Sequence, residues 1–253
     1  MKAASWKFAL VVLVSVFLMP LTAAQGALLA YYTFEGNAND VTGHGYDATV
    51  VQATLTDFGY QGKAYSFNGT SDYISIPLNI NPGPHPQLTM GAWVQASATD
   101  GIRQVISHDN GGYDRSLGLD WRQGYDGSTT QGWSAFAGGG GVLNSGSATS
   151  GAWTFLAVVY DQAAWSVTLY VNNSSFPMTG LLGDGWEYTL IGSNPSFGEY
   201  FSGVIDNVFF FDEALTAAQI ENIRVNGVPL PPSALLLGSG LLGLVGWRKL
   251  RKI

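Results

Sequence analysis

The stretch that decides the fold is Gly151–Asn173, "GAWTFLAVVYDQAAWSVTLYVNN". Within it, Trp153–Tyr160 and Trp165–Asn172 are runs of strand length in which β-branched and aromatic residues are concentrated. Asp, Gly and Asn, which favour turns, stand between and around these runs. The stretch therefore predicts consecutive β-strands that are joined by a turn.

Runs of the same kind recur along most of the chain, and Gly, Asn, Asp or Pro separates them. The others are Leu28–Glu35, Asp47–Thr54, Ala64–Asn68, Tyr73–Pro77, Leu88–Ala96, Arg103–His108, Ser116–Trp121, Gly132–Ala137, Tyr188–Gly192 and Ser202–Phe211. Many short strands at close spacing, without helical patterns between them, indicate an all-β sandwich or barrel rather than βαβ units.

One helix is expected after the last strand. Thr216 is placed as an N-cap, and Gln219 follows three residues later at the spacing of a capping box. Ile220 and Ile223 supply an apolar face, and Gly227 can end the helix. We expect this helix to pack on the sandwich.

Four segments in the right order resemble one known family. They are "GKAYSFNGTSDYISIP" (62–77), "LTMGAWVQAS" (88–97), the Gly151–Asn173 stretch and "LIGSNPSFGEYFSGVIDNVFFFDEALTAAQIENI" (190–223). Together they are similar to laminin-G-like, concanavalin A-like domains over Leu28–Asn226. The resemblance implies a jelly-roll β-sandwich of two antiparallel sheets with one short C-terminal helix. We place this domain at residues 25–227.

The N-terminus reads as a secretory signal peptide over residues 1–24. Lys2 and Lys7 form its positive region, Phe8–Met19 its apolar region, and Thr22–Ala24 a cleavage site of small residues. An uncleaved membrane anchor is the alternative, but an apolar run this short falls below the roughly 20 residues that span a bilayer.

The C-terminus, residues 228–253, resembles a PEP-CTERM sorting signal, with Leu230 where the eponymous Pro-Glu-Pro form has Glu. Ala234–Trp247 is a Gly-interrupted apolar segment, about 21 Å long as a helix. The resemblance implies cleavage by an exosortase-type enzyme, transient contact with the inner membrane, and delivery to the envelope, outer surface or extracellular matrix of a Gram-negative bacterium. A permanent anchor is the alternative. The sorting residues are Val228, Pro229, Leu230, Pro231, Arg248, Lys249, Arg251 and Lys252.

The charge and cysteine content limit the partners. All 18 acidic residues lie between Glu35 and Glu221, and only five basic residues stand in the domain at residues 25–227, so this body carries a net charge of −13. That charge argues against nucleic acid, whose binding depends on Lys and Arg at phosphates. It favours neutral ligands, or a cation that recruits the carboxylates. Cysteine is absent, so an exported domain must be stable through its core alone.

No catalytic pattern is visible. Asp120, Glu187 and Glu199 stand singly in the sequence and are interpreted as solvated turn acids, whereas a retaining glycosidase needs two carboxyl groups about 5–5.5 Å apart. The three histidines lack metal-ligand spacing. The tetraglycine at Gly138–Gly141 lacks the Lys-Ser/Thr ending of a phosphate loop and is interpreted as a flexible hairpin tip. We therefore expect a protein that is not an enzyme.

Calcium is the expected cofactor, in a structural role. Glu35 ends a strand, and Asp40 lies in a turn rich in Asn and Gly, where hard oxygen ligands are plentiful. The resemblance implies that the first and last strands are neighbours and that some members hold Ca²⁺ there, which adds Asp206. The alternative is that Asp40 caps an Asx-turn and Asp206 accepts a backbone hydrogen bond.

The expected activity is non-catalytic recognition of a carbohydrate or an exopolysaccharide. Aromatic rings near the predicted loops suit stacking on sugar rings, and a few polar groups would fix the orientation of the ligand. A structural matrix protein without a discrete ligand and a polysaccharide-cleaving enzyme remain alternatives, and any single Trp can instead belong to the core. The ligand-binding candidates are Asp109, Tyr113, Arg115, Trp121, Tyr125 and Trp133.

Overall fold

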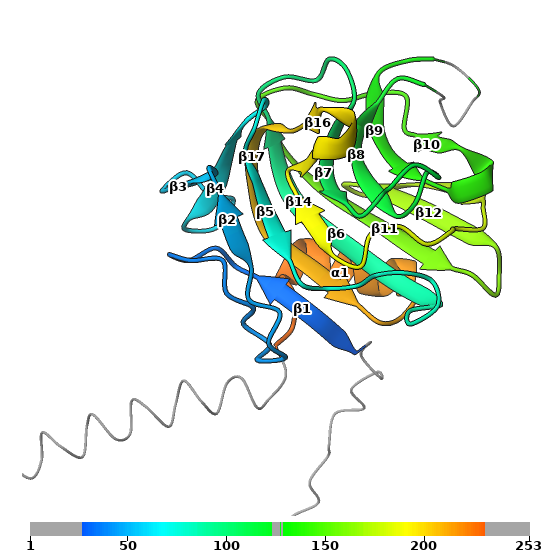
Figure 1. The fold of residues 1–253 in the computed structure, drawn as a ribbon, viewed down its shortest axis with the longest axis horizontal. Helices are drawn as coiled ribbons and strands as arrows, with labels where there is room; N and C mark the ends of the chain where they lie inside the picture. The colour runs from blue at the N-terminus through cyan, green and yellow to red at the C-terminus, as the bar shows by residue number, and fades with distance from the viewer. Residues whose placement is uncertain (1–26, 123–126, 128, 231–253) are drawn as a thin grey trace, which may run out of the picture.

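The computed structural model describes residues 27–122, 127 and 129–230, and this part of the chain forms a two-sheet β-sandwich (Figure 1). The strands of sheet A follow the order β13 (Ser174–Thr179), β12 (Ser166–Val171), β11 (Trp153–Asp161), β6 (Gln87–Ala96), β17 (Ser202–Phe211), β4 (Ala64–Asn68), β3 (Thr54–Thr56). The first strand, β1 (Leu28–Tyr32), also pairs with β17. The hairpin of β11 and β12 is antiparallel from Leu156↔Val171 to Asp161↔Ser166, so the deciding stretch folds as predicted.

Sheet B lies against sheet A across the core. Its order is β10 (Val142–Asn144), β9 (Gly132–Phe136), β8 (Ser116–Asp120), β7 (Arg103–Ser107), β14 (Thr189–Ile191), β5 (Tyr73–Ile76), β2 (Thr49–Val51). Two short strands, β15 (Ser193–Asn194) and β16 (Glu199–Tyr200), flank the 3₁₀ turn η2 (Pro195–Phe197). The ladders along the main order of both sheets are antiparallel, and together with the helix below they confirm the predicted jelly-roll sandwich.

Alternating side chains of the two sheets fill the space between them, as expected for a sandwich. From sheet A, Leu88, Met90, Ala92 and Val94 of β6 point inward, and they meet residues such as Leu117 of β8 on sheet B. The intervening residues point to the outer faces. What covers each outer face therefore decides where a ligand can bind.

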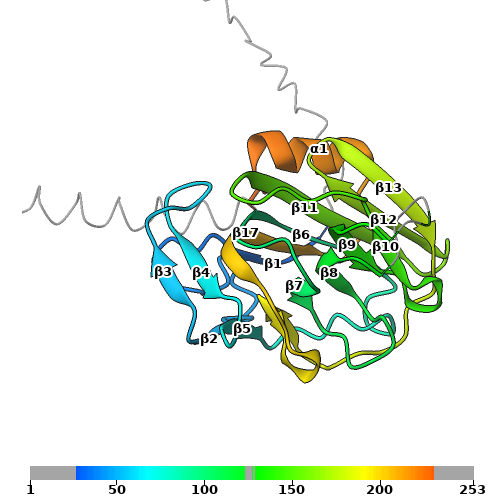
Figure 2. The same ribbon diagram turned by 90° about the horizontal axis from the view of Figure 1, so that it is seen from above.

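The helix α1 (Ala217–Asn226) covers the outer face of sheet A, as Figure 2 shows. Thr216 and Gln219 form the predicted capping box, and Gly227 caps the C-terminus. Ile220 and Ile223 are buried against Trp93, Phe155, Phe209 and other residues of the sheet's outer face. The prediction of one short C-terminal helix that packs on the sandwich is confirmed.

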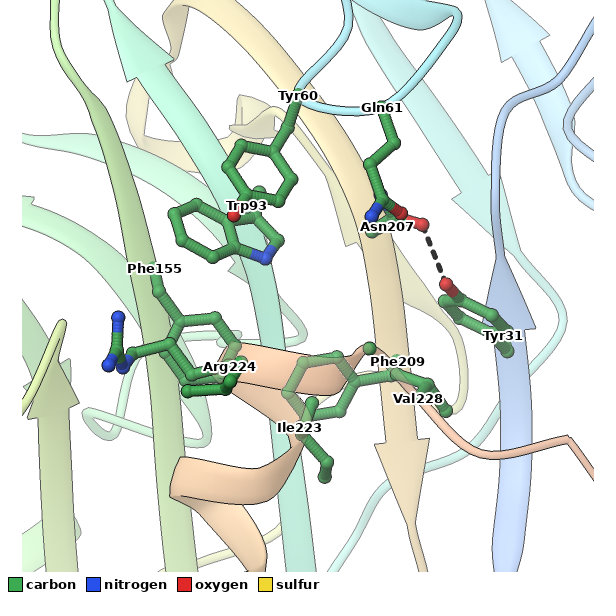
Figure 3. A pocket seen from close by; sticks show the side chains of 12 residues that line it. Tyr31, Tyr60, Gln61, Trp93, Phe155, Asn207, Phe209, Ile223, Arg224 and Val228 are labelled. Atoms are coloured by element: carbon green, nitrogen blue, oxygen red, sulfur yellow. Dashed lines mark hydrogen bonds between the residues drawn. The ribbon is translucent and has the colours of Figure 1, made fainter.

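The small cavity under α1 is too small for a ligand. Figure 3 shows it between α1, β17 and the loop that carries Tyr60, whose ring stacks on Trp93 at 3.6 Å between centroids. The Tyr31 hydroxyl donates a 2.6 Å hydrogen bond to Asn207 Oδ1 at its edge. Its volume of about 20 Å³ is on the scale of one water molecule. The helix-covered face is thus closed.

The twelve expected strands all occur, with differences at their ends. The run Asp47–Thr54 divides into β2 and the start of β3, because Gln52 has a φ of +63° that no extended strand allows. The sequence did not predict β10, β13, β15 and β16. β13 was not predicted because it lacks an apolar strand pattern: it is an exposed edge strand rich in Ser and Thr. It also contains Pro177, a residue type that edge strands tolerate.

The expected signal peptide and the sorting tail beyond Leu230 lie outside the described residues. Over residues 27–122, 127 and 129–230, no helix is long and apolar enough to cross a membrane. The proposed route of export therefore stays a prediction.

Candidate functional site

The outer face of sheet B is the open face of the sandwich. Ala135 and Ala137 of the β9 segment point into the core, so Phe136 between them points outward. In Figures 1 and 2, η2 and the strands around it lie on the side of sheet B that faces away from α1. A ligand can reach the sheet on this side.

A cavity of about 200 Å³ opens on this face. It lies beside β8 and β9, and η2 closes it on the other side. Two of its aromatic rings are well exposed, Tyr113 at 39% and Phe197 at 51%. Its lining residues are Asp109, Gly111, Tyr113, Arg122, Phe136, Phe197 and Glu199.

The loop between β7 and β8 is held by the carboxylate of Asp109. Its Oδ1 accepts hydrogen bonds from the backbone N–H groups of Gly111, Gly112 and Asp114 at 3.3, 3.2 and 2.9 Å. The side-chain amide of Asn194, at the start of η2, donates to Asp109 Oδ2 at 3.2 Å. Asp109 thus ties the loop to η2 and positions both walls of the cavity.

Tyr113 stands in a backbone conformation that is unfavourable for its side chain. Its φ is +55°, in the left-handed region that a bulky residue rarely adopts. Its ring packs edge-on against Phe136 at 5.4 Å between centroids. Strain of this kind persists only where the surroundings enforce it, and it is concentrated at functional sites.

Arg122 forms the floor of the cavity between two acids. Its guanidinium binds Asp120 at 2.6 Å and approaches Glu199 at 3.8 Å. The same group lies 5.2 Å from the centre of the Tyr113 ring and 5.3 Å from that of Phe136, as in cation–π contacts. Burial raises the pKa of Glu199, and a hydrogen bond from Gln104 and the charge of Arg122 oppose this shift only in part.

The structure brings two of the predicted ligand-binding residues into the cavity, Asp109 and Tyr113. Trp121 is exposed but does not line the cavity. Arg115 and Trp133 are buried, so neither side chain is available to a surface ligand. Arg115 instead donates to the backbone oxygens of Ile80 and His85, both at 2.6 Å, while Trp133 belongs to the core. Tyr125 lies outside the described residues.

Sequence reasoning missed five residues of the cavity: Gly111, Arg122, Phe136, Phe197 and Glu199. The interpretation of Asp120 and Glu199 as solvated turn acids is wrong, because both are buried and both approach Arg122. Glu187 is exposed, as expected. The alternation in "GWSAFA" was a usable signal, because it places Phe136 on the face opposite Trp133.

Two of the three predicted calcium ligands, Glu35 and Asp206, accept hydrogen bonds from the same short loop, at Lys63 and Gln61. Among the residues that the structure describes, no group of three or more His, Asp or Glu side chains is placed to hold a metal. Asp40 Oδ1 accepts hydrogen bonds from the N–H groups of Tyr31 and Thr42, and Asp206 accepts from those of Gln61 and Asn207. Glu35 is exposed and accepts from Lys63 N–H. The predicted calcium site therefore stays a prediction.

The tetraglycine joins β9 to β10 in a hairpin, as expected, but it is not merely a tip. Gly138 is buried, and a Cβ atom there would lie 2.1 Å from the backbone oxygen of Leu181. Only glycine allows this close approach.

The comparison with protein families agrees with this fold. The family model described as the concanavalin A-like lectin/glucanases superfamily, Laminin_G_3, matches residues 68–221, which is more than half of the chain. The chain therefore belongs to this superfamily. A comparison with curated protein sequences finds no match.

Solved structures share the fold at low sequence identity. Domain 4 of AbnA, a GH43 extracellular arabinanase from Geobacillus stearothermophilus solved in complex with arabinotriose, has a TM-score of 0.60 at 22% identity, covering 79% of this chain and 98% of that one. The botulinum neurotoxin serotype D binding domain has a TM-score of 0.57 at 14% identity, covering 78% of this chain and 51% of that one. The binding domain of Paraclostridial Mosquitocidal Protein 1 has a TM-score of 0.57 at 16% identity, covering 78% of this chain and 52% of that one.

Proposed function

We propose that this domain is a non-catalytic carbohydrate-binding module that holds a neutral sugar in the cavity on the outer face of sheet B. The observation that carries the proposal is a cavity of about 200 Å³ lined by two exposed aromatic residues, Tyr113 and Phe197, of which Tyr113 is held in an unfavourable backbone conformation. Flat amphipathic rings stack on the apolar faces of sugars. The few polar groups beside them, Arg122 and Glu199, can orient the hydroxyl groups.

The charge of the cavity favours a neutral ligand. Asp109 and Glu199 line the cavity, Asp120 lies directly behind it, and Arg122 is the cation between them. The charge of Arg122 is already matched by Asp120. An anionic sugar would therefore meet uncompensated carboxylates, and repulsion in a partly dehydrated site is costly.

The structural neighbours support a binding role. The arabinanase domain was solved with arabinotriose, and the neurotoxin and mosquitocidal relatives are described as binding domains. Their identity to this chain is too low to carry over a ligand, so arabinan is one probe among several rather than the proposed substrate.

Affinity electrophoresis tests the proposal. The purified domain is run through native gels that contain linear arabinan, β-glucan, galactan or mannan, with polygalacturonate as the anionic control. At least one neutral polymer is expected to retard the wild type, and Tyr113→Ala is expected to weaken that binding roughly tenfold. Trp165→Ala is the matched control, because Trp165 is an exposed aromatic residue at the β11–β12 turn, away from this cavity.

The result that would overturn the proposal is equally direct. If no neutral polymer retards the wild type, or if Trp165→Ala weakens binding as much as Tyr113→Ala does, the cavity is not a sugar site. The structural matrix alternative would then be the better account.

A glycosidase is the second candidate, because the structure brings Asp120 and Glu199 to the same guanidinium group. Burial raises the pKa of Glu199, as for a general acid. However, Asp120 is fully buried, and its carboxylate is occupied by Arg122 and by the Trp121 N–H, so it cannot reach a sugar as a nucleophile. Release of reducing ends that Glu199→Gln abolishes would establish this alternative.

We also propose that the domain is exported and sorted through its C-terminal segment by an exosortase-type enzyme. The proposal rests on the sequence of residues 1–24 and 228–253. Intact-mass measurement of the protein from its host tests it: loss of residues 1–24 and of the segment after the prolines is expected. A native protein of full mass would refute the proposal.

A further inference from the structure

A second cavity, of about 260 Å³, lies on the same face of sheet B. In β5, Ile74 and Ile76 point into the core, so Tyr73 and Ser75 point outward. In β14, Ile191 is in the core and Leu190 points outward. The second cavity therefore opens on the side of the sheet that also carries Phe136 of the first. Its lining residues are Val51, Tyr73, Ser75, Tyr188, Leu190 and Pro195.

The turn η2 contributes one lining residue to each of the two cavities. Pro195, at the start of the turn, lines the second cavity, and Phe197, at its end, lines the first. The turn is fixed at its base, because the Asn194 side chain donates to both the backbone oxygen and Oδ2 of Asp109. The two cavities are thus held in a fixed relation.

The second cavity has the chemistry of a neutral sugar site. No charged residue lines it, and Tyr73, Ser75 and Tyr188 supply hydroxyl groups. The Tyr188 ring is 39% exposed and is stacked on the exposed Trp186 ring, at 5.7 Å between centroids and 16° between planes. A pair of parallel, exposed rings beside an uncharged hollow is a stacking platform rather than a site for an anion.

The distance between the cavities exceeds the reach of a single sugar. The first lies beside β8 and β9, and the second lies over β14, β5 and β2. From β8 to β5 the order is β8-β7-β14-β5. Three strand spacings of about 4.8 Å give about 15 Å. One ligand can occupy both cavities only if it is a chain of several sugars.

We propose that the second cavity is a further subsite for the same glycan, so that the domain binds an internal stretch of a neutral polysaccharide chain across η2 rather than a chain end. This inference rests on the proposed sugar-binding function of the first cavity. Because both subsites act on one chain, the polymer gains affinity over a short fragment without any new type of contact.

The experiment compares a polymer with its own disaccharide, which is too short to reach both cavities, by isothermal titration calorimetry. The probes are linear arabinan, β-glucan, galactan and mannan, each beside its disaccharide. Tyr188→Ala is expected to weaken polymer binding about tenfold and to leave disaccharide binding unchanged, whereas Tyr113→Ala weakens both. Tyr188→Phe retains the ring and is expected to bind the polymer nearly as the wild type does. Trp165→Ala is again the control, and melting curves show that each variant is folded.

The outcomes separate the two proposals. If Tyr113→Ala weakens binding while Tyr188→Ala binds the polymer as the wild type does, the second subsite is refuted and the proposed function stands. If Tyr188→Ala weakens polymer and disaccharide equally, the whole ligand lies in the second cavity, and the two-subsite arrangement is also refuted. If the wild type binds none of the probes, both proposals fail.

Discussion

Replacement of Asp109 by alanine tests how the first cavity is built. In the wild type this buried carboxylate accepts hydrogen bonds from three backbone N–H groups of its own loop and from the side chain of Asn194. The variant removes all four acceptor contacts at once. Asn194 then keeps only its bond to the Asp109 backbone oxygen. The link between η2 and the loop that carries Tyr113 is weakened, so we expect both stability and sugar binding to fall.

The size of the expected loss in stability depends on which N–H donors lose their acceptor. Gly111 and Gly112 are exposed, so water can take over their N–H groups. The Asp114 N–H and the Asn194 amide are buried, and hydrogen bonds to a charged group contribute about 1.5–3 kcal/mol each. Two such losses, at the lower end of that range, amount to about 3 kcal/mol. For a domain of this size that corresponds to a fall in Tm of about 6–12 °C.

Thermal unfolding followed by circular dichroism measures this effect, and Asp109→Asn is the matched control. Asparagine keeps one oxygen for the three backbone donors and loses only the contact with Asn194, so it should cost about 1 kcal/mol. Tyr113→Ala should bind sugar poorly but melt near the wild type. If Asp109→Ala melts at the wild-type temperature, the carboxylate does not hold the loop, and the explanation of the cavity fails.

Three further predictions concern other parts of the molecule. Gly138→Ala should lower the free energy of unfolding, measured by chemical denaturation, by about 2–4 kcal/mol, because its Cβ would meet the Leu181 backbone oxygen. Gly139→Ala is the control and should be nearly neutral, because the space around Gly139 is open. Equal effects of the two substitutions would contradict this explanation. Burial raises the pKa of Asp206 to about 6 from its ordinary 3.8, so the folded state binds that proton more tightly than the unfolded state does. As the pH falls from 7 to 5, the wild type should therefore gain stability relative to Asp206→Asn. A difference in Tm between the two proteins that stays constant over this range would refute the prediction. The predicted structural Ca²⁺ at Glu35, Asp40 and Asp206 implies that EDTA lowers Tm, and an unchanged melting curve would remove that site.

The fold was largely predictable because its signals are local. Strand runs, turn residues and the Thr216 capping box each depend on a few neighbouring residues, and the structure has all of them. The unpredicted strands are the short or exposed ones. β15 and β16 pair with each other around η2 and carry too few residues for a pattern.

The candidate site was only half predictable because its parts come from distant segments. Asp109 and Tyr113 were among the predicted ligand-binding residues, but nothing local connects them to Phe197 and Glu199, which lie more than 80 residues further along the chain. Arg115 was predicted to bind a surface ligand, but its side chain is buried. It donates to the backbone oxygens of Ile80 and His85 in another loop, and nothing local in the sequence indicates these partners.

The outer face of sheet A is covered by a helix and that of sheet B is open, and this difference follows from one feature of the sequence, the capped helix after β17. Because α1 places Ile220 and Ile223 on sheet A, the part of that face beneath the helix is covered, and the cavity there is of water size. Leu28 and Leu230, near the two ends of the described body, pack on the same side. The chain thus enters and leaves the sandwich on the side of sheet A, while both larger cavities open on sheet B. A tether at either end would leave the proposed polysaccharide-binding face free.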